Sequence, residues 1–398
     1  MVDKVFKYLG GDRAIWVVVM FKALLSLLLV YSSIVTLAYK YQGGNTFYYM
    51  IKHGTFVLSG FVIIYLVHRI NYRYLSRIAQ FAVWLVIPLL LLTLVTGNNI
   101  NNASRWLTIP IINQSFQTSD LAKIALVMFI ARFLAIRNEQ LDDFKGTFLP
   151  LMGVVVLVVG LILPANLSTA LVLLMLSMML MFMAGVSIKN LLSVIPVGIA
   201  GIMFVIAVYK VSPETFPRFQ TWEARIERFF TGVEDPNGNY QADQAKIAIA
   251  TGGVFGKGPG NSTQRNFLPS SFSDFIYAIV IEEYGFVGGA GVVFLYLILL
   301  YRSIKIVKKA KGSFAANLVL GLSFSLVIQG LINMMVNVNL LPVTGQTLPL
   351  VSMGGTSMWF TSIAIGIILS VSRTVELEYE EETEEIVEPK HGGKYAKA

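Results

Sequence analysis

Three carboxylates lie in a stretch of sequence that is otherwise apolar enough to enter a membrane. The segment SFSDFIYAIVIEEYGFVGG, residues 271–289, contains Asp274, Glu282 and Glu283. Charged side chains within the hydrocarbon of a bilayer are costly, and they usually face a protein interior or a water-filled cavity. A carboxylate in such a cavity can take a proton from a substrate hydroxyl and so act as a general base. The segment is therefore the first place to look for chemistry.

Helical geometry separates these three side chains. Glu282 and Glu283 follow Asp274 by 8 and 9 residues, which in a helix places them about 12–13 Å deeper. Glu282 then points about 80° away from Asp274 and Glu283 nearly opposite, so the three cannot act on one atom. We expect Asp274, where an outer loop enters the span, to be the chemical residue, although Ser271 and Asp274 also fit a capping box. We expect Glu282 and Glu283 to be structural, one of them pairing with Lys123, because buried charges need partners.

Composition places the chain among polytopic membrane proteins. Of its 398 residues, 55% are hydrophobic and only 14% are charged, and the mean hydropathy is +0.68, whereas soluble domains have about 25% charged residues. The lack of cysteine excludes disulfides, thiolate metal sites and cysteine nucleophiles. The three histidines are scattered, so a histidine metal site is not expected. The net charge of +8 is typical of basic cytoplasmic loops rather than of nucleic-acid binding.

Ten stretches are long and apolar enough to span a bilayer, which requires about 20 residues each. They lie at residues 14–39, 51–71, 75–96, 119–137, 147–164, 167–186, 189–210, 273–301, 314–337 and 353–373. The first follows a basic N-terminus, but it is longer than the apolar region of a signal peptide and shows no A-x-A cleavage site, so we expect it to remain as a span. The predicted fold class is an all-α polytopic membrane protein.

Basic residues set the predicted orientation. The loops on one side carry Lys and Arg, whereas the PAN hairpin at 164–166 and the segment 338–352 on the other side carry neither. The positive-inside rule therefore makes both termini cytoplasmic. We divide the chain into a cytoplasmic N-terminus (1–13), a transmembrane domain (14–373) and a charged tail (374–398), which we expect to be disordered.

The largest predicted outer loop, residues 211–272, joins the seventh and eighth spans. Its RFQTWEARIERFF stretch, 218–230, has aromatic residues at helical spacing, which predicts an amphipathic helix on the membrane surface. GGVFGKGPGNS, 252–262, is not a Walker loop, because no Ser or Thr follows its Gly-Lys pair. We interpret it as a flexible re-entrant turn or, alternatively, as glycine N–H groups that hold a diphosphate beside Lys257 and Arg265.

Other outer segments are also unusual. Arg105 stands beside Trp106 at the predicted interface, and Asp120 and Lys123 share one helix face because they are three residues apart. The uncharged segment 339–358 is broken by Gly and Pro, and such backbone is tolerated at membrane depth only where it is buried or lines a cavity. Because the polar and broken segments gather on the outer side, we expect an outward-open cavity in the bundle.

A series of motifs in order along the chain resembles one known family. VYSS (30–33), RWL, QTSDLAK, ANLSTA, AIATGGVFGKGPGNSTQ, LPSSFSDFIYAIVIEEYGFVG and LLPVTGQTLPLVSMGGTS resemble those of the SEDS family, the shape, elongation, division and sporulation proteins. GNSTQ (260–264) is most similar to the division-type FtsW branch. The chain departs from the family in QTSD for QPSE (Asp120), in NLSTA for DLGTA (Asn166), and in PSSFSDF for PEAHTDF, which keeps Asp274.

This resemblance implies a peptidoglycan glycosyltransferase that polymerises lipid II, the undecaprenyl-pyrophosphate-linked disaccharide peptide, during septal cell-wall synthesis. It implies an active site on the outer face of the cytoplasmic (inner) membrane, with a class B penicillin-binding protein transpeptidase and other divisome membrane proteins as partners. The α-linked donor and the β-1,4-linked product require inversion, and the pyrophosphate leaves without a proton. One carboxylate therefore suffices, as the base that takes the proton of the acceptor hydroxyl, and the resemblance favours Asp274 for this role.

The developing charge on the pyrophosphate requires cationic stabilisation. The candidates for binding the pyrophosphate or sugar are Arg105, Lys123, Lys257, Arg265, Gln264 and Ser352. A divalent cation, Mg²⁺ or Mn²⁺, between Asp274 and the pyrophosphate is compatible with the sequence, although no cluster of ligands requires it.

The alternative interpretation is a lipid II flippase or another transporter. Broken helices and intramembrane charges occur in transporters too. We find no internal repeat, and the polar segments lie on the outer side only, so the sequence favours the enzyme.

Overall fold

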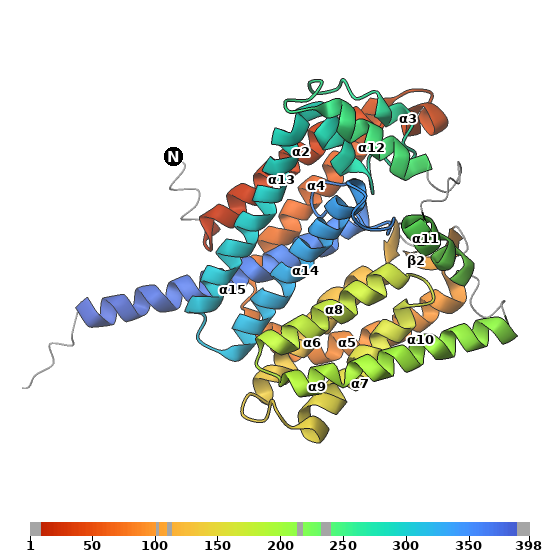
Figure 1. Cartoon of the computed structure of the whole chain (residues 1–398). Coiled ribbons are helices and arrows are strands. Elements are labelled where there is room, and N and C mark those ends of the chain that lie inside the picture. Colours follow the sequence, from red (N-terminus) through yellow and green to blue (C-terminus); the bar gives the residue numbers. More distant parts are fainter. Residues whose placement is uncertain (1–8, 101–102, 110–113, 213–217, 232–239, 388–398) are drawn as a thin grey trace, which may run out of the picture.

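The computed structural model describes residues 9–100, 103–109, 114–212, 218–231 and 240–387. These residues form a bundle of helices with one small antiparallel sheet at one end (Figure 1). In this part of the chain, eight helices are long and apolar enough to cross a bilayer. The fold class predicted from the sequence, a polytopic helical membrane protein, is confirmed at this level.

The elements follow one another along the chain with short connections. The first half contains α2 (Arg13–Ser33), α3 (Val35–Gln42), α4 (Thr46–Arg69), α5 (Tyr72–Thr96), β1 (Asn98–Ile100), β2 (Ala103–Ile109), β3 (Gln114–Gln117), α6 (Thr118–Ile136), the π-helix η1 (Phe144–Phe148), α7 (Leu149–Ile162) and α8 (Leu167–Met183). The second half contains α9 (Ile188–Leu192), α10 (Val194–Val211), α11 (Phe219–Thr231), α12 (Tyr240–Gly252), the 3-10 helix η3 (Gln264–Asn266), α13 (Ile276–Lys309), α14 (Ser313–Asn337) and α15 (Thr356–Val387).

Eight of the ten predicted spans overlap these eight candidate membrane helices. The other two overlap α6 and α8. The 19 residues of α6 include the charged Asp120, Lys123 and Arg132, and α8 has only 17 residues. The count of ten and the position of the large loop therefore stay predictions.

The centre of the bundle is built from α14 and α15. In each of them, 67% of the most apolar window is buried inside the protein, whereas in the helix pair α9–α10 the share is 6%. Accordingly, α10 runs along one outer edge of the molecule (Figure 1). Since α14 contacts α6, α8 and α13, it joins the helix of Asp120 and Lys123 to the helix of Glu282 and Glu283.

The first span ends earlier than predicted, because α2 stops at Ser33 and α3 continues after Ile34. The carbonyl oxygen of Ser32 accepts a hydrogen bond from the Arg265 guanidinium at 3.2 Å, and that of Ser33 accepts one from the Ser271 hydroxyl at 3.1 Å. Carbonyls near a helix end need such partners. Side chains of the outer loop thus stabilise the end of α2.

The tail from residue 374 onward was predicted to be disordered. This prediction is wrong for residues 374–387, because α15 continues to Val387. The extension leaves the bundle as a single helix (Figure 1). Two contacts hold its first turns: Arg73 pairs with Glu378 at 2.8 Å, and the Lys309 ammonium lies 5.1 Å from the ring centroid of Tyr379. Residues 388–398 lie outside the described part of the chain.

A three-stranded antiparallel sheet lies between the third and fourth predicted spans, where no strand was predicted. The strand order is β1-β2-β3, and β2 pairs with β3 through Trp106 opposite Gln117 and Thr108 opposite Ser115. Aromatic and β-branched residues, which favour strands, are frequent in β2. The sheet matters for the site because it carries Arg105 and because β3 leads directly into α6.

The long helix α13 is broken at Gly285, whose φ of 69° and ψ of −170° are not helical. The carbonyls of Glu282 and Glu283 accept hydrogen bonds from the N–H groups of Lys257 and Gly258, both at 2.9 Å. The glycine-rich loop is therefore an ordered backbone partner of α13 and not a flexible turn. These two N–H groups are occupied, so they do not bind a diphosphate.

We expect Gly285→Ala to destabilise the protein by about 2–4 kcal/mol, because only glycine readily adopts this backbone conformation. An added Cβ would also clash with the carbonyl oxygen of Val254. Gly291→Ala is the matched control, since a Cβ at Gly291 meets nothing within 4 Å. The midpoint of thermal unfolding of the purified proteins measures both. Equal midpoints for the two variants would contradict this role of the break.

Candidate active site

Asp274 lies in the turn just before α13, and neighbouring elements hold its backbone. The side-chain amides of Asn333 and Asn337, one turn apart on α14, donate to the carbonyl of Asp274 at 2.8 and 2.9 Å. The hydroxyl of Ser352 donates to the carbonyl of Ser273 at 2.7 Å. The backbone at Asp274 is therefore fixed by α14 and by the loop that precedes α15.

The carboxylate of Asp274 is not used as a helix cap. Its Oδ1 accepts one hydrogen bond, from the Ser273 hydroxyl at 2.9 Å. The capping box that the sequence allowed does not form, because α13 begins at Ile276 without a side-chain cap and Ser271 donates to α2 instead. On its other side the carboxylate borders Gly345, where an added Cβ would lie 3.6 Å from Oδ2. The side chain is thus positioned but has few partners, as a base requires.

The electrostatic environment of Asp274 combines burial with nearby cations. Burial raises the pKa of the Asp274 carboxyl above its ordinary value of 3.8, and this effect exceeds the opposing effects of the Ser273 hydrogen bond, Arg105 and Arg225. A carboxylate with a raised pKa is a better proton acceptor than an exposed one.

Arg105 and Arg225 lie near this carboxylate, Arg218 lies near both of them, and the three arginines donate to two backbone carbonyls. Arg105 on β2 donates to the carbonyl of Ala165 at 2.8 Å, and Arg218, just before α11, donates to the same oxygen at 3.3 Å. Arg225 on α11 donates to the carbonyl of Val343 at 3.1 Å. The Ala165 carbonyl belongs to the predicted PAN hairpin between α7 and α8.

Burial and mutual repulsion act on these arginines. Burial, with the charges of Arg218 and Arg225, lowers the pKa of Arg105 to about 10. Burial, with the charge of Arg225, also lowers the pKa of Arg218, and burial together with Arg228 lowers that of Arg225. Arg105 nevertheless stays protonated at neutral pH. Cations that are held close together repel one another, and an anion bound between them would reduce this repulsion.

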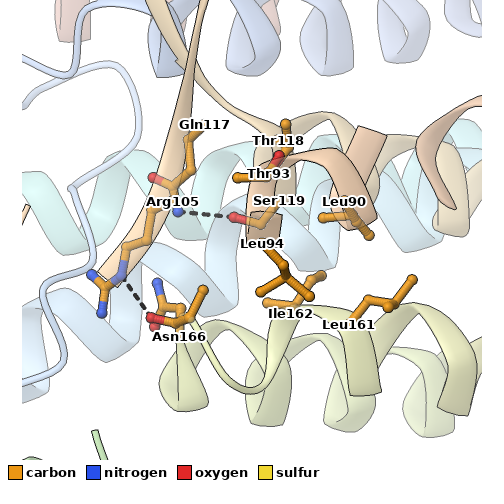
Figure 2. Close-up of a pocket in the computed structure, with 11 residues that line it drawn as sticks. Leu90, Thr93, Leu94, Arg105, Gln117, Thr118, Ser119, Leu161, Ile162 and Asn166 are labelled. Atoms are coloured by element: carbon orange, nitrogen blue, oxygen red, sulfur yellow. Dashed lines mark hydrogen bonds between the residues drawn. The ribbon is translucent and has the colours of Figure 1, made fainter. Parts of the chain in front are cut away.

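Figure 2 shows Arg105 reaching from its strand toward the hairpin that contains Asn166, next to a small cavity. The cavity has a volume of about 20 Å³, which is room for about one water molecule. Asn166 caps α8, since its side chain accepts from the Thr169 N–H at 3.3 Å. The cavity is too small for a sugar or a pyrophosphate, so we do not identify it with the substrate site. The outward-open cavity expected from the sequence stays a prediction.

Lys257 and Arg265 lie elsewhere, around the two buried glutamates. Lys257 Nζ forms an ion pair with Glu282 at 2.6 Å, and Arg265 donates to the Ser32 hydroxyl at 3.1 Å. The Ser32 hydroxyl in turn donates to the carboxylate of Glu283. The structure therefore separates these cations from Asp274 and joins them to the structural carboxylates.

Glu282 is enclosed by the loop after α12. Its side chain is 0% exposed and accepts hydrogen bonds from the Ser262 hydroxyl, from the Thr263 hydroxyl at 2.8 Å and from the Gln264 N–H at 3.2 Å. The candidate Gln264 thus contributes its backbone to Glu282, and its side-chain Oε1 is buried.

Lys123 does not pair with either glutamate, so that prediction is wrong. Its ammonium forms an ion pair with Asp120 at 2.8 Å and donates to Gln329 Oε1 on α14 at 2.9 Å. The prediction that Asp120 and Lys123 share one helix face is confirmed by this pair. Lys123 has closer partners than the glutamates, because Asp120 lies on the same helix and Gln329 lies on α14, which packs against that helix. Ser352 is also buried and bonded within the protein.

Sequence reasoning missed Arg218 and Arg225 as site residues. Both belong to the segment that we interpreted as an amphipathic surface helix, and α11 is indeed helical from Phe219 to Thr231. Their separation of seven residues, about two helical turns, places them on one face. That spacing of two arginines could have indicated a cationic face on this helix. The aromatic residues of the same stretch indicated a helix on the membrane surface instead.

In the described part of the chain, no three His, Asp or Glu side chains come together as a metal-binding group. If a divalent cation binds here, the carboxylate of Asp274 would hold it together with oxygens of a substrate. The divalent cation stays a prediction.

The fold and the site together define a multi-pass helical membrane protein with a partly buried carboxylate near arginines at one end of its bundle. Residues 12–377 match the FtsW/RodA/SpoVE family, whose members are described as cell cycle proteins. The chain belongs to this family. The resemblance seen in the sequence motifs is thereby confirmed.

Relatives and solved structures agree with this assignment. The chain is 31% identical to a probable peptidoglycan glycosyltransferase FtsW of Geobacter sp. strain M18, covering 91% of this chain and 97% of the relative. It is 30% identical to stage V sporulation protein E of Bacillus subtilis strain 168, covering 92% and 98%.

Among solved structures, it resembles a chain from a peptidoglycan synthase complex that coordinates polymerization and crosslinking, with a TM-score of 0.71, 24% identity and coverage of 92% and 99%. It also resembles the rod shape determining protein RodA of Thermus thermophilus, with a TM-score of 0.65, 24% identity and coverage of 92% and 98%. At this identity the structures support the fold alone.

The two kinds of carboxylate should respond differently to neutralisation. We expect Glu282→Gln to lower the free energy of unfolding by about 3 kcal/mol, because it leaves Lys257 without its buried partner. We expect Asp274→Asn to change it by less than about 1 kcal/mol, since Asn keeps an acceptor for Ser273. Thermal unfolding of both variants in the same detergent measures this difference. A larger loss for Asp274→Asn would make Asp274 a structural residue.

Proposed function

We propose that this protein is a peptidoglycan glycosyltransferase that polymerises lipid II into β-1,4-linked glycan strands. The observation that carries the proposal is the partly buried carboxylate of Asp274, which accepts a hydrogen bond from Ser273 and is acted on electrostatically by Arg105 and Arg225. The names of the FtsW relatives support the class of enzyme.

The proposed reaction is a single inverting transfer. The carboxylate of Asp274 takes the proton of the acceptor sugar's 4-hydroxyl as that oxygen attacks the anomeric carbon of the donor. The bond from this carbon to the pyrophosphate oxygen breaks, and its electron pair leaves with undecaprenyl pyrophosphate. Because the leaving group is an anion that needs no proton, the transfer requires a base and cations but no second carboxylic acid.

In this proposal the arginines stabilise the charge that develops on the pyrophosphate. Arg105, Arg218 and Arg225 are held by the carbonyls of Ala165 and Val343, so they are oriented before the substrate arrives. Oriented charges at a site of charge development are among the largest contributions to catalysis. This assignment replaces Lys257 and Arg265, whose hydrogen bonds go to the glutamate clusters, and it also leaves out Lys123, which is paired with Asp120.

We further propose that the site faces the outer side of the cytoplasmic membrane and that the enzyme acts in septal wall synthesis with a class B penicillin-binding protein. The absence of basic residues from the PAN hairpin and from 338–352, both next to the site, supports the outer location. The resemblance of its motifs to those of the SEDS family supports a partnership with a crosslinking enzyme.

Polymerisation of labelled lipid II by the purified protein with its class B partner, with transpeptidation blocked, tests the proposal. We expect glycan chains from the wild type and a rate lower by about 10²- to 10⁴-fold from Asp274→Asn, because the variant lacks the base. Lys246→Gln is the control, since Lys246 is an exposed residue paired with the exposed Asp243. Unchanged polymerisation by a folded Asp274→Asn variant would remove Asp274 from the reaction. If the wild type forms no chains but moves lipid II across vesicle membranes, the protein is a flippase instead.

The pH dependence tests the electrostatic part of the site. The base acts only when ionised, so activity falls as the pH drops through the pKa of Asp274, which lies above 3.8 because of burial. Arg225 lowers that pKa, so we expect Arg225→Gln to move the acidic limb of the rate profile to higher pH. We also expect the maximal rate to fall by about tenfold to a hundredfold, because a cation near the leaving group is lost. An acidic limb that stays in place or moves to lower pH would contradict the assignment of Arg225.

A further inference from the structure

A second cavity lies at the far end of α13, away from Asp274. The 34 residues of α13 separate the two ends by about 50 Å. The cavity has a volume of about 360 Å³ and lies between the start of α2, the last turns of α13 and the point where α15 leaves the bundle. By the positive-inside rule, this end faces the cytoplasm. The proposed glycosyl transfer uses none of these residues.

The walls of this cavity carry an excess of positive charge. Arg302, Lys305, Lys308 and Lys309 line it on α13, facing two carboxylates, Asp12 and Glu376. The excess of cations makes the cavity a place where an anion is favoured.

One of the two carboxylates is already neutralised and bonded. Asp12 accepts from Arg302 Nε at 2.8 Å and forms an ion pair with its Nη2 at 2.6 Å. Its Oδ1 also caps α2 by accepting from the N–H groups of Ala14 and Ile15 at 2.9 and 3.1 Å. Asp12 therefore has no need of the lysines as partners.

The three lysines keep their charge directed toward solvent and the cavity. Lys305, Lys308 and Lys309 are exposed and form no ion pair within the described part of the chain. The ammonium of Lys305 lies 4.7 Å from the ring centroid of Tyr301, and that of Lys309 lies over Tyr379 on α15. These ring contacts hold the side chains without neutralising them.

We propose that this cavity binds a phosphate-bearing anion through the ammonium groups of Lys305, Lys308 and Lys309. A lysine binds phosphate as a point charge, so three lysines around one hollow suit a phosphate group better than a planar carboxylate. The membrane is the source that the position favours, because basic clusters at the cytoplasmic ends of membrane helices attract anionic headgroups. The exposed ring of Tyr301, on the same helix end, is of the kind that anchors a helix at the headgroup level.

Binding of two probes to the full-length protein tests the proposal without any measurement of polymerisation. The probes are phosphatidylglycerol in nanodiscs of otherwise zwitterionic phosphatidylcholine, and inorganic phosphate in solution. The test variant is Lys305→Gln/Lys308→Gln/Lys309→Gln. The control variant is Arg77→Gln/Lys145→Gln/Lys189→Gln, which removes three exposed charges from the same predicted side of the membrane but none from the cavity.

We expect the test variant to bind phosphatidylglycerol about tenfold or more weakly than the wild type, and the control variant to bind it nearly as well as the wild type. If inorganic phosphate, and not the lipid, shows this pattern, the site binds a soluble phosphate and the phosphate assignment stands. If binding is weakened equally in both variants, the protein attracts the probes only through its overall charge, and the proposal is wrong. The proposal is also wrong if the wild type binds neither probe. Thermal unfolding of both variants confirms that each is folded, so a loss of binding is not a loss of structure.

Discussion

The burial of Glu282 is the constraint on which the arrangement of the Asp274 end of the bundle depends. A carboxylate with no exposure, on a helix that enters the membrane, needs partners for both of its oxygens. The loop after α12 supplies them through Lys257, Ser262, Thr263 and Gln264. The same loop pairs with the backbone where α13 breaks at Gly285. Once these bonds form, the start of α13 is fixed, and with it the turn that contains Asp274.

The charged residues at this end of the bundle divide into two groups. In the first, the two carboxylates of Glu282 and Glu283 are matched in number by the cations of Lys257 and Arg265, and all four side chains have bonds within the protein. In the second, around Asp274, the arginines are bonded mainly to neutral carbonyls, so their charge is available to an anion. Burial and repulsion make this second group costly. A site that binds a highly charged substrate is where such a cost is expected.

Much of this organisation could be predicted from the sequence. Hydropathy predicted the spans, and the resemblance of the motifs indicated the family and Asp274. The partners of Glu282 could not be predicted, because they lie 18 to 25 residues away in a loop without periodic pattern. The pairing of Lys123 with Glu282 or Glu283 was predicted wrongly, because the neighbours of Lys123 depend on how the helices pack. Hydropathy does not determine this packing.

Two further features show the same limit. The sheet escaped prediction because β1 and β3 have only three and four residues, too short for an alternating pattern to be distinguished from a loop. The helical extension of α15 was interpreted as disordered from its charge, although its glutamates favour helices and Glu378 finds a partner on a distant helix. In both places contacts distant in sequence decide the local structure.

The two asparagines on α14 have a mechanical consequence for the reaction. Asn333 and Asn337 attach the main chain of Asp274 to α14, whereas Arg105 and Arg218 are attached to the hairpin between α7 and α8. The proposed base and these arginines therefore belong to different parts of the scaffold. A small shift of α14 along its axis would carry Asp274 with it and leave these arginines behind. In the proposed reaction, the distance between the base and the arginines is thus set by the position of one central helix, and a force on that helix would change this distance.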